Sequence, residues 1–239
     1  MYKNLTPYID KNLYTKKNKP EKIINFNSMG FRGNDIDTTK KNILIAGCSI
    51  YYCSGVDEPY IFPNLLLEKL GSDYGYLNVS MPGTGIEAQI KNITWALSNF
   101  KFEKLLWLGS HPSRGICYHE QYGMMNYGPV NPAGANNTWF NSNQGKTWID
   151  NRIGNGYNTM CKLTDITETL FVLLKALNID VYTSNWDADY NDNFFKPLRS
   201  QFGFKGLPFF YRYDKAADGV HAGIKSHSIH AEELAKLIS

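Results

Sequence analysis

A serine, an aspartate and a histidine stand where acyl-transfer chemistry would need them. Ser49 follows Gly47 and Cys48 at the end of a short apolar run, and Asp218 precedes His221 by three residues. This offset within one loop lets a carboxylate reach the imidazole of the same loop, which fixes the histidine tautomer. We therefore expect Ser49 to be the nucleophile, His221 its base and Asp218 the orienting group. The plainer alternative is that Ser49 is a turn or helix-cap residue and that Asp218 only caps the last helix.

Acyl transfer also needs hydrogen-bond donors for the oxyanion. Gly83 follows Pro82 after a second apolar run, and His111 follows Gly109 and Ser110 after a third. In a parallel sheet, ligands bind beyond the carboxyl ends of the strands, so residues that follow the strands converge on one edge. We expect Gly83 and His111 to lie at that edge with Ser49.

The elements that must position these residues alternate along the chain. Alternating strands and helices predict an α/β fold with a parallel sheet of about five strands covered on both faces. Asp165, with Glu168 three residues on, is typical of a helix N-cap. We expect strands over 42–46, 76–80, 104–108, 179–184 and 209–213, and helices over 62–70, 86–100, 166–177 and 224–238.

A long segment between the third strand and the next helix, about 110–160, has no sustained periodicity and is rich in Asn, Gly, Tyr and Trp. Insertions of this length are usually lids or binding surfaces. Aromatic rings among amides suit sugars, so we expect Tyr118, Trp139 and Trp148 to contact substrate. The alternative is that these rings pack on the parent domain. Arg114 would anchor an anionic substituent or a carboxylate of the protein itself.

Composition excludes several classes of protein. A net charge of +3 over 239 residues gives no reason to expect nucleic acid or an anionic membrane as a partner. No stretch has the apolar length of a membrane span, and the N-terminus lacks a secretory h-region, which predicts synthesis in the cytoplasm.

The four cysteines lack zinc-like spacing, so we expect free thiols. His227 and His230 are interpreted as a solvated helix face, and neither a metal nor a cofactor is expected.

Four blocks in this order resemble the SGNH (GDSL-like) hydrolases. Gly47-Cys48-Ser49 matches the Gly-Asp-Ser block, and Asn78-Val79-Ser80-Met81-Pro82-Gly83 is similar to the second block. Leu108-Gly109-Ser110-His111 occupies the place of Gly-x-Asn, and Asp218-Gly219-Val220-His221 resembles Asp-x-x-His. The lead-in Asn27-Ser28-Met29-Gly30-Phe31-Arg32-Gly33 resembles a subset found in bacteria and their viruses.

The resemblance implies a three-layer, flavodoxin-like α/β/α domain over residues 26–239, preceded by an arm over 1–25. It also implies a catalytic triad of Ser49, Asp218 and His221, with the oxyanion bound by the backbone N–H groups of Ser49 and Gly83 and by His111. The substrate would be a small acyl ester, with an O-acetylated carbohydrate favoured, and the enzyme an esterase or a transferase. Two residues depart from the pattern: Cys48 replaces the Asp beside the nucleophile, and His111 replaces the oxyanion Asn.

Two rival hypotheses remain. In the first, the fold is a catalytically impaired glycan-binding or structural module, for instance of a phage virion, with Cys48 and His111 as marks of a decayed site. Homo-oligomers or virion assembly would then be its partners. The second is a nucleotide binder, but the first predicted strand is not followed by a phosphate-cradling Gly-rich loop.

Overall fold

A five-stranded parallel sheet forms the centre of the molecule. The computed structural model describes residues 24–111, 114–119, 123–127, 156–185 and 194–239. Within these residues the strand order is β2-β1-β3-β6-β7, and every neighbouring pair is parallel. The strands are β1 (Lys41–Gly47), β2 (Tyr74–Asn78), β3 (Lys104–Gly109), β6 (Asp180–Asn185) and β7 (Lys205–Gly206).

The central strand β1 shows why both faces of the sheet are covered. Every residue of the strand after Lys41 is buried, and the sequence from Ile43 to Ala46 is a continuous apolar run and not an alternation. Ile43 and Ile45 belong to one hydrophobic cluster, whereas Leu44 and Ala46 belong to the other. Successive side chains of a strand point to opposite faces, so one strand supplies both cores.

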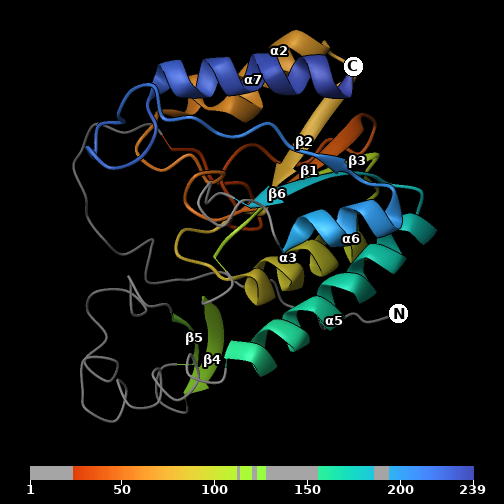
Figure 1. Cartoon of the computed structure of the whole chain (residues 1–239). Helices are drawn as coiled ribbons and strands as arrows, with labels where there is room; N and C mark the ends of the chain where they lie inside the picture. The colour runs from red at the N-terminus through yellow and green to blue at the C-terminus, as the bar shows by residue number, and fades with distance from the viewer. Residues whose placement is uncertain (1–23, 112–113, 120–122, 128–155, 186–193) are drawn as a thin grey trace.

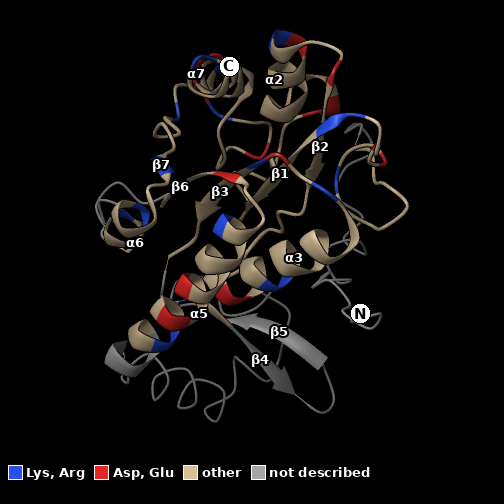
Figure 2. Ribbon diagram, turned by 90° about the vertical axis from the view of Figure 1, so that its right-hand side faces the viewer, with Lys and Arg blue, Asp and Glu red and all other residues tan. Residues whose placement is uncertain are grey.

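Helices form a layer on each side of the sheet (Figure 1), and a view turned by 90° shows the same two layers (Figure 2). Helices α2 and α7 pack together on one face, and α3, α5 and α6 cover the other. The three-layer α/β/α prediction is therefore confirmed. No helix in the described parts of the chain has the length and apolar character that crossing a bilayer requires. The helices are α2 (Phe62–Leu70), α3 (Ile86–Asn99), α5 (Gly156–Ala176), α6 (Phe195–Phe202) and α7 (Ile224–Ile238), with a 3₁₀ turn η1 (Glu58–Tyr60).

Three features differ from the sequence-based expectations. The fifth strand is the two-residue β7 and not 209–213, where Tyr211 and Tyr213 stay about half exposed, with tilted rings 6.0 Å apart, and do not join the sheet. Asp165 is no N-cap, since α5 begins nine residues earlier at Gly156. A separate antiparallel hairpin, β4 (Gly115–His119) and β5 (Gly123–Tyr127), follows β3 in the predicted insertion.

The interpretation of His227 and His230 as a solvated helix face is also wrong. Both side chains lie on the buried side of α7, only 1% and 2% exposed. His230 shares a 3.0 Å hydrogen bond with the Tyr51 hydroxyl, and His227 Nδ1 accepts one from the backbone N–H of Phe62. Burial lowers the pKa of each histidine to about 3, so both are neutral members of an aromatic core.

Candidate active site

A cavity of about 480 Å³ lies at the carboxyl-end edge of the sheet. It brings together three regions that are far apart in the sequence: the turn after β1, the start of the hairpin after β3, and the segment that leads into α7. Of the predicted site residues, Ser49, His221 and Arg114 all line it. The other described lining residues are Cys48, Ile50, Phe209, Phe210, Arg212, Val220 and Ala222.

Asp218 holds the ring of His221 from behind. Its Oδ2 lies 2.7 Å from His221 Nδ1, and its Oδ1 accepts the backbone N–H groups of Val220 and His221, each at 2.9 Å. Partial burial opposes ionisation, but these amide and ring hydrogen bonds outweigh it and lower the pKa of Asp218 below its ordinary value. Asp218 is therefore a carboxylate at neutral pH, and His221 Nε2 is the ring nitrogen left for a reacting group.

A second aspartate closes the loop that carries this pair. Asp214 Oδ1 accepts hydrogen bonds from the N–H and hydroxyl of Ser226, and Oδ2 accepts the N–H of Lys225. These groups belong to the first turn of α7, whose N-cap, Gly223, has no capping side chain. Inside the loop the N–H of Ala216 donates to His221 O at 2.9 Å. Asp214 therefore caps the first turn of α7, although it lies outside the helix. Because Asp214 precedes the Asp218–His221 segment and α7 follows it, this contact closes the loop that contains the segment.

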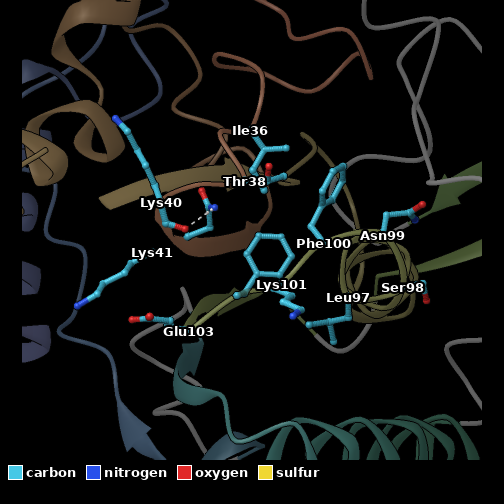
Figure 3. Close-up of a pocket in the computed structure, with 12 residues that line it drawn as sticks. Ile36, Thr38, Lys40, Lys41, Leu97, Ser98, Asn99, Phe100, Lys101 and Glu103 are labelled. Atoms are coloured by element: carbon cyan, nitrogen blue, oxygen red, sulfur yellow. Dashed lines mark hydrogen bonds between the residues drawn. The ribbon is translucent and has the colours of Figure 1, made fainter. Parts of the chain in front are cut away.

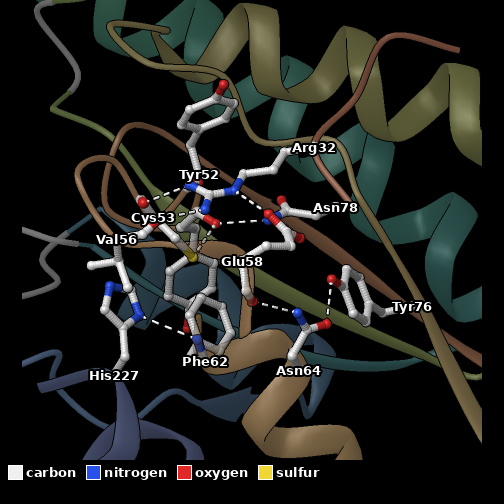
Figure 4. A network of polar contacts seen from close by, with 11 residues as sticks. Arg32, Tyr52, Cys53, Val56, Glu58, Phe62, Asn64, Tyr76, Asn78 and His227 are labelled. Atoms are coloured by element: carbon white, nitrogen blue, oxygen red, sulfur yellow. Dashed lines mark hydrogen bonds and ion pairs between the residues drawn. The ribbon is translucent and has the colours of Figure 1, made fainter. Parts of the chain in front are cut away.

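The turn that carries Ser49 is fixed by a buried arginine from the lead-in (Figure 4). Arg32 is only 1% exposed, and its Nε donates to Glu58 Oε2 at 2.9 Å. The remaining guanidinium nitrogens donate to three backbone carbonyls of the residues that follow Ser49, those of Tyr52, Cys53 and Val56, at 2.5–3.0 Å. Cys53 has a φ of +63°, a conformation that side chains other than glycine seldom adopt. The arginine therefore stabilises a strained turn directly behind the candidate nucleophile.

The same turn touches the Asp218 carboxylate. A Cβ placed on Gly55 would lie 2.6 Å from Asp218 Oδ2, and the φ of +82° at this position also favours glycine. The carbonyl of Gly55 accepts the N–H of Ala217 at 3.3 Å. Arg32, the turn after Ser49 and the Asp218–His221 loop therefore form one packed unit.

Gly83 lies on a turn that is tied to the end of β1. The carbonyl of Gly47 accepts the N–H of Met81 at 3.2 Å and the hydroxyl of Thr84 at 3.3 Å. Gly83 is partly exposed, and a Cβ placed on it would meet no atom within 4 Å. The space beside the Gly83 Cα is therefore open, although Gly83 is not one of the residues that line the 480 Å³ cavity.

His111 stands at the end of β3, also outside the lining of that cavity. The buried Gln89 fixes this strand end, because its Nε2 donates to Ser110 Oγ and its Oε1 accepts the indole N–H of Trp107. The carbonyl of His111 accepts the N–H of Arg114 at 3.0 Å. The backbone of His111 is therefore held beside Arg114.

Some predicted substrate-binding residues are not described by the structure. Trp139 and Trp148 lie outside the described residues, and Tyr118 is described only as a backbone position in β4. Sequence reasoning also missed Arg32, Asp214 and Arg212. The position of Arg32 within the Gly-punctuated lead-in could have indicated a structural role for this residue. No local sequence pattern indicates a role for Asp214 or Arg212.

A larger cavity, of about 660 Å³, lies at the opposite edge, where β1 and β3 begin (Figure 3). Its charged lining residues are all exposed, and its lining includes no histidine. Because it lacks a paired nucleophile and base, we do not consider it a candidate catalytic site. The charged residues are Lys40, Lys41, Lys101 and Glu103.

Comparison with known proteins identifies the fold. No family model and no curated protein matches the sequence. Among solved structures, TesA has a TM-score of 0.52 at 15% identity over 83% of this chain and 98% of its own. The psychrotrophic esterase EstA from Pseudoalteromonas sp. has a TM-score of 0.51 at 13% identity, covering 82% of this chain and 96% of its own. A protein assigned to the G-D-S-L family of lipolytic proteins, from Desulfitobacterium hafniense, has a TM-score of 0.51 at 8% identity, covering 83% of this chain and 100% of its own. The chain therefore has the three-layer α/β/α fold found in SGNH (GDSL-type) hydrolases.

Proposed function

We propose that this protein is a serine esterase of the SGNH type. Ser49 is the nucleophile, His221 the general base and Asp218 the residue that orients the base. The observation that carries the proposal is the 2.7 Å contact between Asp218 and His221, in the wall of a cavity that Ser49 also lines. A buried or fully solvated histidine would not suit this role, and the His221 side chain, 27% exposed, is neither.

The reaction proceeds in two steps. Ser49 Oγ attacks the ester carbonyl while its proton passes to His221 Nε2, and the oxyanion is bound by the backbone N–H groups of Ser49 and Gly83. The C–O bond then breaks, His221 returns the proton to the departing alcohol, and the acyl group stays on Ser49. Water, activated by His221, hydrolyses the acyl-enzyme in the second step, whereas a sugar hydroxyl in its place makes the enzyme a transferase.

The substrate we favour is an O-acetyl group on a carbohydrate. The support comes from a row of aromatic rings that begins at the cavity with Phe209 and continues through Tyr211 to Tyr213. Their centroids are 4.6 Å and 6.0 Å apart, and the two tyrosines are 55% and 51% exposed. Exposed aromatic rings beside a catalytic pocket suit the apolar faces of sugars.

The test compares two serines at opposite edges of the sheet. Ser49→Ala removes the proposed nucleophile, whereas Ser98→Ala changes an exposed serine that lines the larger, opposite cavity. A fluorophosphonate probe should label the wild type and Ser98→Ala but not Ser49→Ala, and acetyl-ester hydrolysis should follow the same pattern. Equal labelling of all three proteins would exclude Ser49 as the nucleophile.

His111 requires its own experiment, because it replaces the amide side chain that the fold family uses at this position. If its imidazole donates to the oxyanion, His111→Ala should lower kcat about a hundred- to a thousandfold. His111→Asn restores the amide and should keep or raise kcat. If neither substitution changes kcat, the two backbone donors alone bind the oxyanion.

One alternative has a specific observation in its favour. Cys48 and His111 both depart from the catalytic pattern, which suits a glycan-binding or structural module that has lost turnover. Binding on a sugar array, with no acetate released from any acetylated ligand, would select this alternative over the esterase.

A further inference from the structure

We propose that the substrate carries a negatively charged substituent, a carboxylate or another oxyanion, which Arg114 and Arg212 bind beside Ser49. This inference rests on the proposed esterase function and specifies its substrate class. Both guanidinium-bearing residues line the same cavity as Ser49 and His221 but come from segments almost a hundred residues apart. Guanidinium groups are suited to paired hydrogen bonds with carboxylate and phosphate oxygens.

Arg212 is held against the wall that carries the candidate base. Its Nη1 donates to the carbonyl of Val220 at 2.7 Å, one residue before His221. This bond uses one of the five N–H donors of the group, so most of its hydrogen-bonding capacity is left for a ligand. Within the described part of the chain, no carboxylate forms an ion pair with Arg212. A structural ion pair therefore does not account for its place in the cavity.

Arg114 is fixed from its backbone. Its N–H donates to His111 O at 3.0 Å, and a Cβ placed on Gly85 would lie only 2.3 Å from its carbonyl oxygen. The turn before α3, two residues after Gly83, therefore packs directly on the Arg114 backbone. This contact holds the Arg114 backbone close to the turn that carries Gly83, and both Arg114 and Arg212 line the same cavity.

The charge balance of the cavity favours an anion. None of its described lining residues is acidic, and the lining includes two arginines among the apolar side chains of Ile50, Phe209, Phe210 and Val220. Asp218 lies behind His221 and already accepts two amides and the imidazole. An anionic group bound in this cavity would therefore meet two guanidinium groups and no carboxylate among the described lining residues.

The experiment uses pairs of esters that differ only in charge. 3-Acetoxybenzoate and 3-acetoxybenzamide place the charge or its neutral isostere on the alcohol side, and monophenyl glutarate and its terminal amide place them on the acyl side. We expect kcat/KM of the wild type to be roughly 10- to 100-fold higher for the anion of at least one pair. The pair that shows the preference identifies the side of the ester that bears the charge.

Substitutions assign the preference to the two arginines. In the double variant Arg114→Gln/Arg212→Gln the ratio of kcat/KM between anion and amide should fall to about one, mainly through KM. Lys175→Gln, which removes one positive charge from an exposed position near the end of α5, should keep the wild-type ratio. A ratio that is near one in the wild type, or equally high in the double variant, overturns the inference.

A binding measurement separates this inference from the esterase proposal. Calorimetric titration of Ser49→Ala with 3-hydroxybenzoate and 3-hydroxybenzamide, and with monophenyl glutarate and its terminal amide, requires no turnover. We expect the anions to bind more tightly, and the double arginine change to abolish the difference. If anions bind in this way but no ester is hydrolysed, the anion site stands and the esterase proposal fails. If esters are hydrolysed with no preference in rate or binding, the esterase proposal stands and the anion site is wrong.

Discussion

The two edges of the sheet both carry a cavity with charged residues, yet they differ in how those residues are held. The amino-end cavity is the larger, 660 Å³ against 480 Å³. The charged side chains of both edges are largely exposed, but at the carboxyl-end edge Asp218, His221 and Arg212 are fixed by hydrogen bonds at 2.7–2.9 Å. Side chains held in place by hydrogen bonds are therefore a better criterion for a candidate site than the volume of the cavity.

The largest effect should come from the orienting carboxylate. Asp218→Asn keeps the shape of the loop but loses the charge that holds the His221 tautomer, so kcat for ester hydrolysis should fall about ten-thousandfold. Glu103→Gln makes the same chemical change in the amino-end cavity and should leave kcat unaltered. Steady-state kinetics of both variants test the contrast between the two edges, and equal kcat in the two would refute it.

A second contrast compares two ion pairs. Arg32 and Glu58 are buried behind the Ser49 turn, whereas Lys104 and Asp180, at the amino ends of β3 and β6, form a pair in which Asp180 is 65% exposed. Arg32→Met leaves Glu58 buried without a partner and should lower the free energy of unfolding by about 3–5 kcal/mol. Asp180→Asn should cost less than about 1 kcal/mol. Urea unfolding gives both values, and similar losses would contradict the contrast.

The third prediction concerns how the stability of the fold beside the carboxyl-end cavity depends on pH. His227 and His230 pack against Phe210, which lines the carboxyl-end cavity, and their pKa values in the folded state are about 3. Unfolding restores the ordinary value of about 6.5, so the unfolded chain binds more protons at mildly acidic pH. Stability is therefore full above pH 6.5 and should fall by a few kcal/mol as the pH is lowered.

Unfolding in urea at pH 7.5, 5.5 and 4.5 measures this loss, and a histidine variant separates it from the carboxylates, which begin to titrate at the lowest of these pH values. A His230→Phe variant should show a shallower dependence on pH than the wild type, because only His227 then titrates. Constant stability between pH 7.5 and 4.5 would mean that the two rings are not buried as neutral imidazoles.

The smallest effect should be at the amino-end cavity itself. Lys40→Gln with Lys101→Gln removes two exposed charges, and the free energy of unfolding should change by less than about 0.5 kcal/mol per site. Hydrolysis of anionic and neutral esters should keep the wild-type ratio. A fall in that ratio would show that the amino-end lysines, and not only the two arginines, attract the substrate.

Much of the fold could be predicted from the sequence because its signals are local. The run predicted at 42–46 became the core of β1, and the helices predicted at 62–70, 86–100 and 224–238 correspond to α2, α3 and α7 with little error. The errors arose where tertiary packing decided. The segment with Tyr211 and Tyr213 has the pattern of a strand, but these two rings lie exposed, close to Phe209 of the cavity. The pattern of His227 and His230 suggests solvent exposure, but α7 buries both rings against Phe62.

Local signals in the sequence were enough to predict which residues follow the strands or precede the last helix: Ser49 after β1, Gly83 after β2, His111 after β3, and Asp218 with His221 before α7. Local propensity and motif order suffice for that, because each signal spans only a few residues. The surroundings of these residues depend on how distant segments pack against one another. Arg32 reaches the Ser49 turn, Gly55 touches Asp218, and Arg114 and Arg212 line one cavity. No local pattern in the sequence predicts these contacts, because they form only when the helices and strands of the parallel sheet pack together.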